Sequence, residues 1–232
     1  MNAAIELVVF DIAGTTIKDN GEIASAFQCA LHEFGYEVPL EKINPLMGYK
    51  KTEAIKRMLI EYEENEEKIS RRLINRIHNR FLQLMVEHYS TTDQLTSLPN
   101  AEEVFSKLRA LEIKIALNTG FPKEITDVIM ERTGWIRNNT VDEVISSSEV
   151  PSGRPSSHMI QELMKRTSVT DPKKVVKVGD TEVDVAEGRN AGCLYSIGVT
   201  TGAFRREELE HYYPSYIIDD LLELLPIVES HQ

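Results

Sequence analysis

The chain has 232 residues, of which 41% are hydrophobic and 27% are charged, so it can bury a core and suits one domain, or one core that carries a smaller insert. Its formal net charge of −11 argues against nucleic acid as a partner, because an acidic surface repels the phosphate backbone. Two widely separated cysteines, no signal-peptide pattern and no apolar run near the roughly 20 residues of a membrane helix indicate a reducing, cytoplasmic setting without a membrane.

Short apolar runs recur along the chain and indicate strands. The first, Ile5–Phe10, is apolar except for Glu6 and predicts a buried parallel strand. Five later runs share its character: Ile113–Leu117, Val141–Ile145, Val175–Val178, Leu194–Val199 and the shorter Tyr216–Ile218. Helical patterns alternate with them at Ala101–Leu111, Lys123–Thr133, Ser157–Arg166, Val183–Ala191 and Asp219–Val228. This alternation predicts an α/β fold, with a Rossmann-like parallel sheet covered by helices on both faces.

A helical block interrupts this rhythm directly after the first strand. Apolar spacing predicts helices at Glu22–Phe34, Lys51–Glu61 and Glu66–Tyr89. Such an insert would cap the carboxyl end of the sheet, where open α/β sheets bind ligands. We therefore expect residues 1–16 and 91–232 to form the core and residues 17–90 an all-helical cap, with hinges near 17–21 and 90–99 that let the cap close.

Carboxylates follow the first and the fourth predicted strands. Asp11 ends the first strand before a turn of small residues, while Asp180 and Asp184 follow Val178 at a strand end and in the first turn of the next helix. Two carboxylates at that spacing can converge on one Mg²⁺. Taken singly, each acid is explained equally well as a turn residue or a helix cap.

Groups suited to phosphate binding follow two other strands. The Thr119 hydroxyl and the backbone N–H groups around Gly120 could hold phosphate oxygens. Arg154 could neutralise a phosphoryl group and a nucleophile. Alone, a Thr-Gly turn and a loop arginine are common surface features.

The order of these residues is more specific than any one of them. An Asp, a Thr, a basic residue and a paired Asp, each after its own strand, resemble the haloacid dehalogenase (HAD) superfamily over essentially the whole chain. The resemblance implies that Asp11 is a nucleophile that forms an aspartyl-phosphate. It also implies that Mg²⁺ is bound by Asp11, the backbone carbonyl of Ala13 and Asp180, with Asp184 nearby or acting through water. The metal lets two anions approach each other.

Ala13 narrows the resemblance to one branch. Most HAD phosphatases carry a second Asp at this position to protonate the leaving oxygen, and a methyl group cannot transfer a proton. Alanine here is typical of phosphonoacetaldehyde hydrolase (phosphonatase). Four strings are similar to motifs of that branch: Asp11-Ile-Ala-Gly-Thr-Thr, Thr119-Gly120-Phe121, Gly153-Arg154-Pro155, and Lys177-Val-Gly-Asp-Thr with Glu187-Gly-Arg-Asn-Ala-Gly.

The resemblance also implies a role for Lys51. The branch places an imine-forming lysine three residues after a Met-Gly pair, which here is Met47-Gly48, so these two residues are expected beside the substrate. The helical register supports Lys51 independently. Its helix face carries Ile55, Met58, Leu59 and Tyr62, whereas Lys50 aligns with Ala54, Arg57 and Glu61. An inward lysine would have a lowered pKa and a free amine.

Three departures leave the substrate open. A His, a Tyr and a Cys of the branch are here Ala54, Phe121 and Gly21. One interpretation is a hydrolase of the C–P bond of phosphonoacetaldehyde or a close relative. The alternative is a phosphatase for a small organic phosphate monoester, such as a phosphoglycolate-like compound, with Lys51 as a plain cation.

Two further interpretations carry less weight. A dehalogenase would not need the two metal acids, and a catalytically weak binding protein is favoured only by Ala13. The expected partner is a small phosphorylated or phosphonate substrate. The resemblance also allows a homodimer formed through the cap, since phosphonatases pair through theirs.

Overall fold

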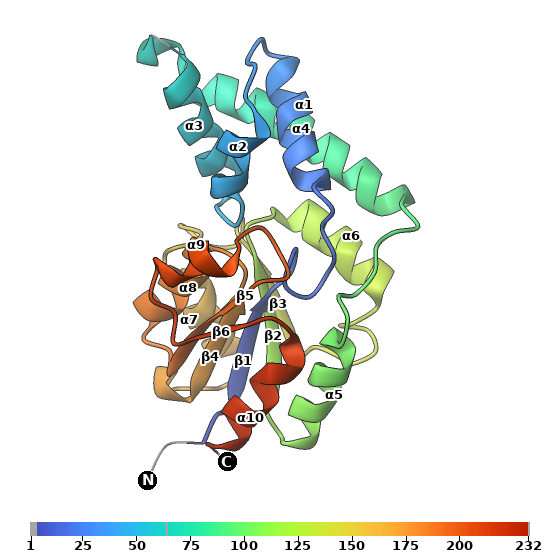
Figure 1. The fold of residues 1–232 in the computed structure, drawn as a ribbon. Coiled ribbons are helices and arrows are strands. Elements are labelled where there is room, and N and C mark those ends of the chain that lie inside the picture. The colour runs from blue at the N-terminus through green and yellow to red at the C-terminus, as the bar shows by residue number, and fades with distance from the viewer. Residues whose placement is uncertain (1–3, 64, 232) are drawn as a thin grey trace.

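The computed structural model describes residues 4–63 and 65–231, and within them the strands form one parallel sheet in the order β3-β2-β1-β4-β5-β6 (Figure 1). The strands are β1 Leu7–Asp11, β2 Lys114–Thr119, β3 Glu143–Ser146, β4 Val175–Gly179, β5 Tyr195–Val199 and β6 Tyr216–Ile218. The predicted α/β fold with a parallel sheet is confirmed.

Strand β1 explains why both faces of the sheet must be covered. Val8 and Phe10 pack into the main hydrophobic core, whereas Leu7 and Val9 pack into a second core on the other face. A strand that is apolar on every residue has no face to leave in water. The first core is shared with α5 Ala101–Ala110, α6 Lys123–Thr133 and α10 Leu224–Glu229, and the second is covered by α7 His158–Arg166, with α8 Glu182–Ala191 beside it.

The remaining helices between β1 and α5 pack together beyond the carboxyl ends of the strands (Figure 1). We call them the cap helices: α1 Glu22–His32, α2 Leu40–Ile43, α3 Lys51–Tyr62 and α4 Arg71–Thr91, with 3-10 turns at Asn44–Leu46 and Glu66–Lys68. Their packing includes stacked rings of Phe27 and Phe81, whose centroids lie 4.2 Å apart. From the core, Arg132 donates hydrogen bonds to the carbonyl oxygens of Tyr89 and Ser90 at 3.0 and 2.9 Å, which anchors the end of α4.

The structure differs from the sequence prediction mainly in short elements. The predicted helix at Glu66–Tyr89 begins only at Arg71, because the Ser70 hydroxyl accepts a hydrogen bond from the Leu73 N–H at 3.2 Å and caps a new helix. Helices α2 and α9 (Arg206–Glu210), and the 3-10 turns Pro172–Lys174 and Leu221–Glu223, are too short to show an apolar period. Across the described residues, no helix is long and apolar enough to cross a membrane.

Candidate active site

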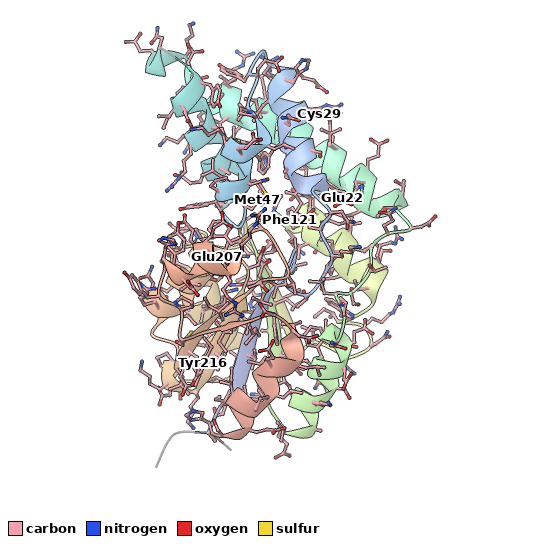
Figure 2. All side chains as sticks on the ribbon, viewed as in Figure 1. Glu22, Cys29, Met47, Phe121, Glu207 and Tyr216 are labelled. Atoms are coloured by element: carbon pink, nitrogen blue, oxygen red, sulfur yellow. The ribbon has the colours of Figure 1, made fainter. Side chains whose placement is uncertain are left out.

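The topology brings three of the predicted site residues to one edge of the sheet. Asp11 and Thr119 are the last residues of β1 and β2, and Asp180 follows the last residue of β4. Because β2, β1 and β4 are parallel neighbours, their carboxyl ends meet. Met47, from the segment between the 3-10 turn Asn44–Leu46 and α3, and Phe121, from the turn after β2, are labelled close to this edge in Figure 2.

A cavity of about 30 Å³ lies between this edge and the cap helices. It is lined by Asp11, Ala13, Asp19, Ile23, Met47, Gly48, Lys51, Thr119, Gly120, Phe121, Asp180, Thr181 and Ala203. All the predicted catalytic, substrate-binding and metal-binding residues are in this set except Arg154 and Asp184, which lie behind Asp11.

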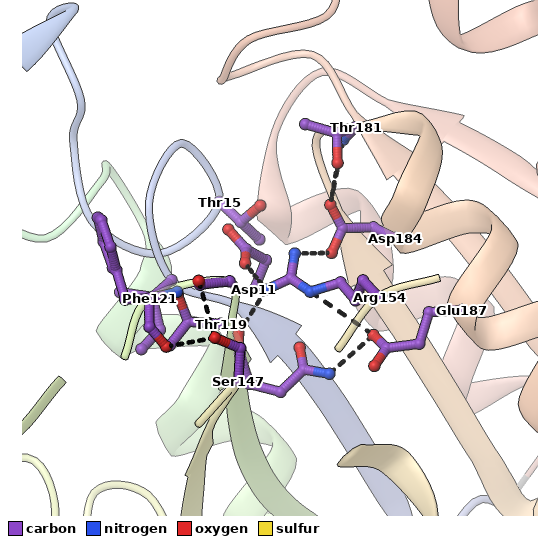
Figure 3. A network of polar contacts seen from close by, with 12 residues as sticks. Asp11, Thr15, Thr119, Phe121, Ser147, Arg154, Thr181, Asp184 and Glu187 are labelled. Atoms are coloured by element: carbon purple, nitrogen blue, oxygen red, sulfur yellow. Dashed lines mark hydrogen bonds and ion pairs between the residues drawn. The ribbon is translucent and has the colours of Figure 1, made fainter. Parts of the chain in front are cut away.

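Arg154 is buried beside the predicted nucleophile and pairs with three carboxylates, those of Asp11, Asp184 and, at 3.8 Å, Glu187 (Figure 3). It forms an ion pair with Asp11, a second with Asp184 at 2.6 Å, and a hydrogen bond to the carbonyl oxygen of Asn118 at 3.1 Å. Burial opposes its charge, but Asp11, Asp184 and Glu187 together raise the pKa of Arg154 above its usual range. Arg154 therefore stays charged and fixes the Asp11 carboxylate in place.

A second buried cation, Lys177, contacts the same group of carboxylates. The sequence pattern alone did not indicate a role for it in the site. Its amino group lies 2.9 Å from Asp184 and donates a hydrogen bond to Asn118 at 2.8 Å, while the Asn118 amide donates to Glu187 at 2.8 Å. Burial raises the pKa of Glu187 to about 7, against the effect of Lys177 and Arg154. The sequence does contain an indication of this role. Lys177 is the only charged residue in the apolar run Val175–Val178, and a charge in a buried strand needs buried partners of opposite charge.

Hydrogen bonds hold the turn after β2 in place, so that Thr119 and Gly120 line the cavity. The Phe121 N–H donates to the Thr119 hydroxyl at 3.1 Å, and Ser147, in the loop after β3, donates to the carbonyl oxygens of Gly120 and Phe121 at 2.9 and 3.0 Å. Thr119 and Gly120 are thereby fixed at the cavity wall, where a phosphoryl group would need hydrogen-bond donors.

The donor set around Asp180 fits Mg²⁺. Its carboxylate accepts hydrogen bonds from the Ala203 N–H at 2.7 Å and the Thr15 hydroxyl at 3.3 Å. Burial raises the pKa of Asp180 well above its usual value, and the charges of Asp11 and Asp184 raise it further. Buried carboxylates that repel one another are stabilised by a hard cation with oxygen ligands.

Asp184, in contrast, is already paired. Although burial opposes its charge, Arg154 and Lys177 lower the pKa of Asp184, and the Thr181 hydroxyl donates to it at 2.5 Å. Among the described residues, no group of three or more His, Cys, Asp or Glu side chains is arranged to hold a metal ion. The predicted ligands are the carboxylates of Asp11 and Asp180 and the carbonyl oxygen of Ala13, with Asp184 nearby or acting through water.

Replacing Asp180 with alanine should therefore remove Mg²⁺ dependence together with most of the activity, by roughly 10³-fold for a lost ligand and charge. The measurement is the rate of phosphate release as Mg²⁺ is titrated. The control is Asp171→Ala, because Asp171 lies outside the site, where it caps a 3-10 turn. Near wild-type activity of Asp180→Ala, with Mg²⁺ still required, would contradict the proposed metal site.

Lys51 is buried, as its helical register predicted, with 3% of its surface exposed, whereas Lys50 is half-buried. Its amino group lies 5.0 Å from the ring centroid of Phe121 and 5.6 Å from that of Phe27. It forms no ion pair within the described part of the chain. Burial, followed by the nearby charge of Arg154, lowers the pKa of Lys51 to about 8. With a pKa of about 8, roughly a tenth of the Lys51 amine is neutral at pH 7, far more than for an ordinary lysine.

The segment that carries Lys51 packs directly on the core. A Cβ atom on Gly120 would lie 2.5 Å from the carbonyl oxygen of Tyr49, and one on Gly48 would lie 2.5 Å from the Thr181 hydroxyl. The Tyr49 hydroxyl also donates a hydrogen bond to Glu182 of α8 at 2.7 Å. These contacts hold the segment that carries Lys51 against the core, over the cavity of about 30 Å³.

Gly48 gives a test of closure. Its φ of +82° and its contact with Thr181 disfavour any side chain, so Gly48→Ala should shift the cap toward an open form and reduce kcat at least about tenfold. Gly35→Ala is a matched control, because Gly35 has a φ of +88° and nothing within 4 Å of an added Cβ. It carries the same backbone strain of about 1 kcal/mol. Equal activity of the two variants would count against closure as a requirement for turnover.

Comparison with known proteins agrees with this geometry. Residues 8–199 match the family model of haloacid dehalogenase-like hydrolases. The chain belongs to this family. It is 34% identical over 199 residues to the phosphonoacetaldehyde hydrolase of Latilactobacillus sakei subsp. sakei (strain 23K), a match that covers 82% of this chain and 74% of the relative. It is 32% identical over 226 residues to that of Bacteroides fragilis, covering 91% and 83%. The chain is thus a hydrolase of the phosphonatase-like branch.

Solved structures show the same fold. A phosphonoacetaldehyde hydrolase-like protein from Oleispira antarctica has a TM-score of 0.82 at 23% identity, over 99% of this chain and 93% of that one. A putative phosphoglycolate phosphatase from Lactobacillus delbrueckii subsp. bulgaricus has a TM-score of 0.79 at 19% identity, over 97% and 98%.

Proposed function

We propose that this hydrolase is Mg²⁺-dependent and cleaves the C–P bond of phosphonoacetaldehyde or a close relative, with Asp11 as nucleophile and Lys51 as an imine-forming amine. One observation carries the proposal. A buried lysine with a lowered pKa and a buried aspartate line the same cavity of about 30 Å³. The relatives named phosphonoacetaldehyde hydrolase give the substrate class.

On the phosphorus side, the Asp11 carboxylate attacks and becomes an aspartyl-phosphate. Arg154 aligns that carboxylate, and the Thr119 hydroxyl with the Gly120 N–H binds phosphoryl oxygens. Mg²⁺ held by Asp11, Asp180 and the carbonyl oxygen of Ala13 would offset the negative charges of the nucleophile and the phosphoryl group.

On the carbon side, the neutral Lys51 amine adds to the aldehyde and loses water to give an imine. The imine nitrogen takes up a proton, and when the C–P bond breaks, its electron pair moves into this protonated imine, which becomes a neutral enamine. No acid on a leaving oxygen is needed, which agrees with the methyl group of Ala13. The enamine then takes up a proton and is hydrolysed to free acetaldehyde and Lys51. Water releases inorganic phosphate from Asp11.

One observation favours the alternative, a phosphatase for a small phosphate monoester. Lys51 lies over the faces of Phe27 and Phe121, and such contacts stabilise the charged amine rather than the neutral one. The His and Tyr of the phosphonatase branch are also absent, at Ala54 and Phe121.

Phosphate release in the presence of Mg²⁺ separates the two functions. The proposed function predicts a higher kcat/KM for phosphonoacetaldehyde than for any member of a panel of phosphate monoesters that includes phosphoglycolate. A phosphate ester turned over while phosphonoacetaldehyde is not would establish the alternative.

A further inference from the structure

One titratable side chain on the cavity wall has no part in the chemistry described so far. Asp11, Asp180 and Lys51 have proposed roles, and the fourth titratable group is Asp19. The proposed chemistry also lacks a general base. Hydrolysis of an aspartyl-phosphate needs a base to take a proton from water, and the methyl group of Ala13 cannot do so.

Asp19 is held in position by the segment that joins β1 to α1. Ile17 bridges to Ala13 and to Ser97, and the Lys18 N–H donates to the carbonyl oxygen of Thr96 at 3.1 Å. The Gly21 N–H donates to one carboxylate oxygen of Asp19 at 3.0 Å. These contacts restrict the movement of the half-buried Asp19 side chain.

Asp19 and the nucleophile Asp11 lie on the wall of the same small cavity. A volume of about 30 Å³ is room for roughly one or two water molecules. Water held in this cavity therefore has both carboxyl groups on its wall.

We propose that Asp19 is the general base for hydrolysis of the aspartyl-phosphate at Asp11. The Asp19 carboxylate takes a proton from water, the water oxygen forms a bond to phosphorus, and the P–O bond to Asp11 breaks with its electron pair returning to the Asp11 carboxylate. Asp19 then gives its proton to solvent. The inference rests on the proposed nucleophile, but it holds for a C–P bond and for a phosphate ester alike.

The charges around Asp19 suit a base that works near neutral pH. Burial, together with a hydrogen bond to Glu22 of α1, raises the pKa of Asp19 to about 6. Lys51 of α3 faces it as a cation, Tyr89 of α4 as a buried hydroxyl, and Asp11 of β1 as an anion across the cavity. The carboxylate form predominates above about pH 6, so the base function is lost as the pH falls through that value.

A plainer role for Asp19 is to hold the turn before α1, through the hydrogen bond that its carboxylate accepts from the N–H of Gly21. Asparagine keeps that role, because its side-chain oxygen can still accept the hydrogen bond from the Gly21 N–H. It cannot accept a proton from water. Asp19→Asn therefore separates the structural function from the chemical one.

The experiment follows turnover of phosphonoacetaldehyde and of acetyl phosphate, a small phosphoryl donor whose leaving group needs no proton. Reaction mixtures are quenched, and phosphate on Asp11 is measured as homoserine after borohydride reduction. Asp19→Asn should reduce kcat by roughly 10²- to 10³-fold, while the phosphorylated fraction of the enzyme rises toward full occupancy. The acid limb near pH 6 in the wild-type kcat profile should disappear.

Glu22→Gln provides a second, independent readout. It removes a negative charge and a hydrogen bond that raise the pKa of Asp19, so the acid limb should move to lower pH while the plateau rate is kept. An unmoved limb would contradict the proposal, as would a loss of turnover in Asp19→Asn without accumulation of phosphoenzyme. Wild-type turnover without any phosphate on Asp11 would instead overturn the proposed nucleophile, and the role of Asp19 with it.

Discussion

Replacement of Asp11 with asparagine is expected to abolish turnover, by on the order of 10⁴-fold or more, while the protein still folds. A neutral amide does not attack phosphorus. Asparagine keeps an oxygen for Arg154, which also retains its partner Asp184. Removing the Asp11 charge also relieves its repulsion of Asp180, whose pKa it raises. We therefore expect a Tm close to that of the wild type.

The measurements are phosphate release and thermal unfolding. Asp127→Asn is the matched control, because Asp127 is an exposed acid paired with Lys123 on the surface, and exposed pairs contribute little. In the wild type, beryllofluoride with Mg²⁺ should form an aspartyl-phosphate mimic on Asp11. A mimic attached to a different carboxylate, or an active Asp11→Asn enzyme, would remove Asp11 as nucleophile.

Much of the fold follows from the sequence because buried parallel strands have a simple pattern. The run Leu7–Phe10 is apolar at every position and packs on both faces of the sheet. Once the strands are parallel neighbours, residues at their carboxyl ends must meet. The sequence pattern therefore predicts that Asp11, Thr119 and Asp180 lie close together.

Other parts of the site depend on contacts that local patterns do not encode. The spacing of Asp180 and Asp184 suggests two metal acids, but Asp184 is paired with Arg154 and Lys177, which come from other segments. Asp184 as a ligand, directly or through water, stays a prediction. Asp19 reaches the cavity only because the linker folds back through Ile17, and a lone acid before a helix resembles an ordinary cap.

The start of α4 after Ser70 is in principle predictable from the sequence. A serine directly before a helical apolar pattern is an N-cap signal, but the apolar period that already begins at Ile69 obscures the helix start after Ser70. The packing of the segment that carries Lys51 against the core is a second feature that the sequence pattern does not predict. It depends on close approaches at Gly48 and Gly120 to residues of other segments, which no periodicity encodes.

Lys51→Arg decides between C–P cleavage and phosphatase chemistry. Arginine keeps the positive charge but cannot form an imine, so loss of a covalent step should lower kcat for phosphonoacetaldehyde by at least about 10³-fold. Lys50→Arg is the control, since the neighbouring lysine is only half-buried and does not line the cavity of Asp11. Lys51→Met removes the charge as well and should be equally inactive if the amine acts covalently.

The imine itself can be trapped, and its pH dependence follows from the pKa of Lys51. Borohydride added with phosphonoacetaldehyde should reduce the imine and label Lys51 in the wild type. Because the pKa of Lys51 is lowered to about 8, the neutral fraction grows as the pH rises through that value, and the rate of labelling should grow with it. If Lys51 is only a cation, Lys51→Arg should keep much of the activity, Lys51→Met should lose it, and no reduced adduct should form. That result would transfer the assignment to a small phosphate monoester, bound by Lys51 and attacked by Asp11.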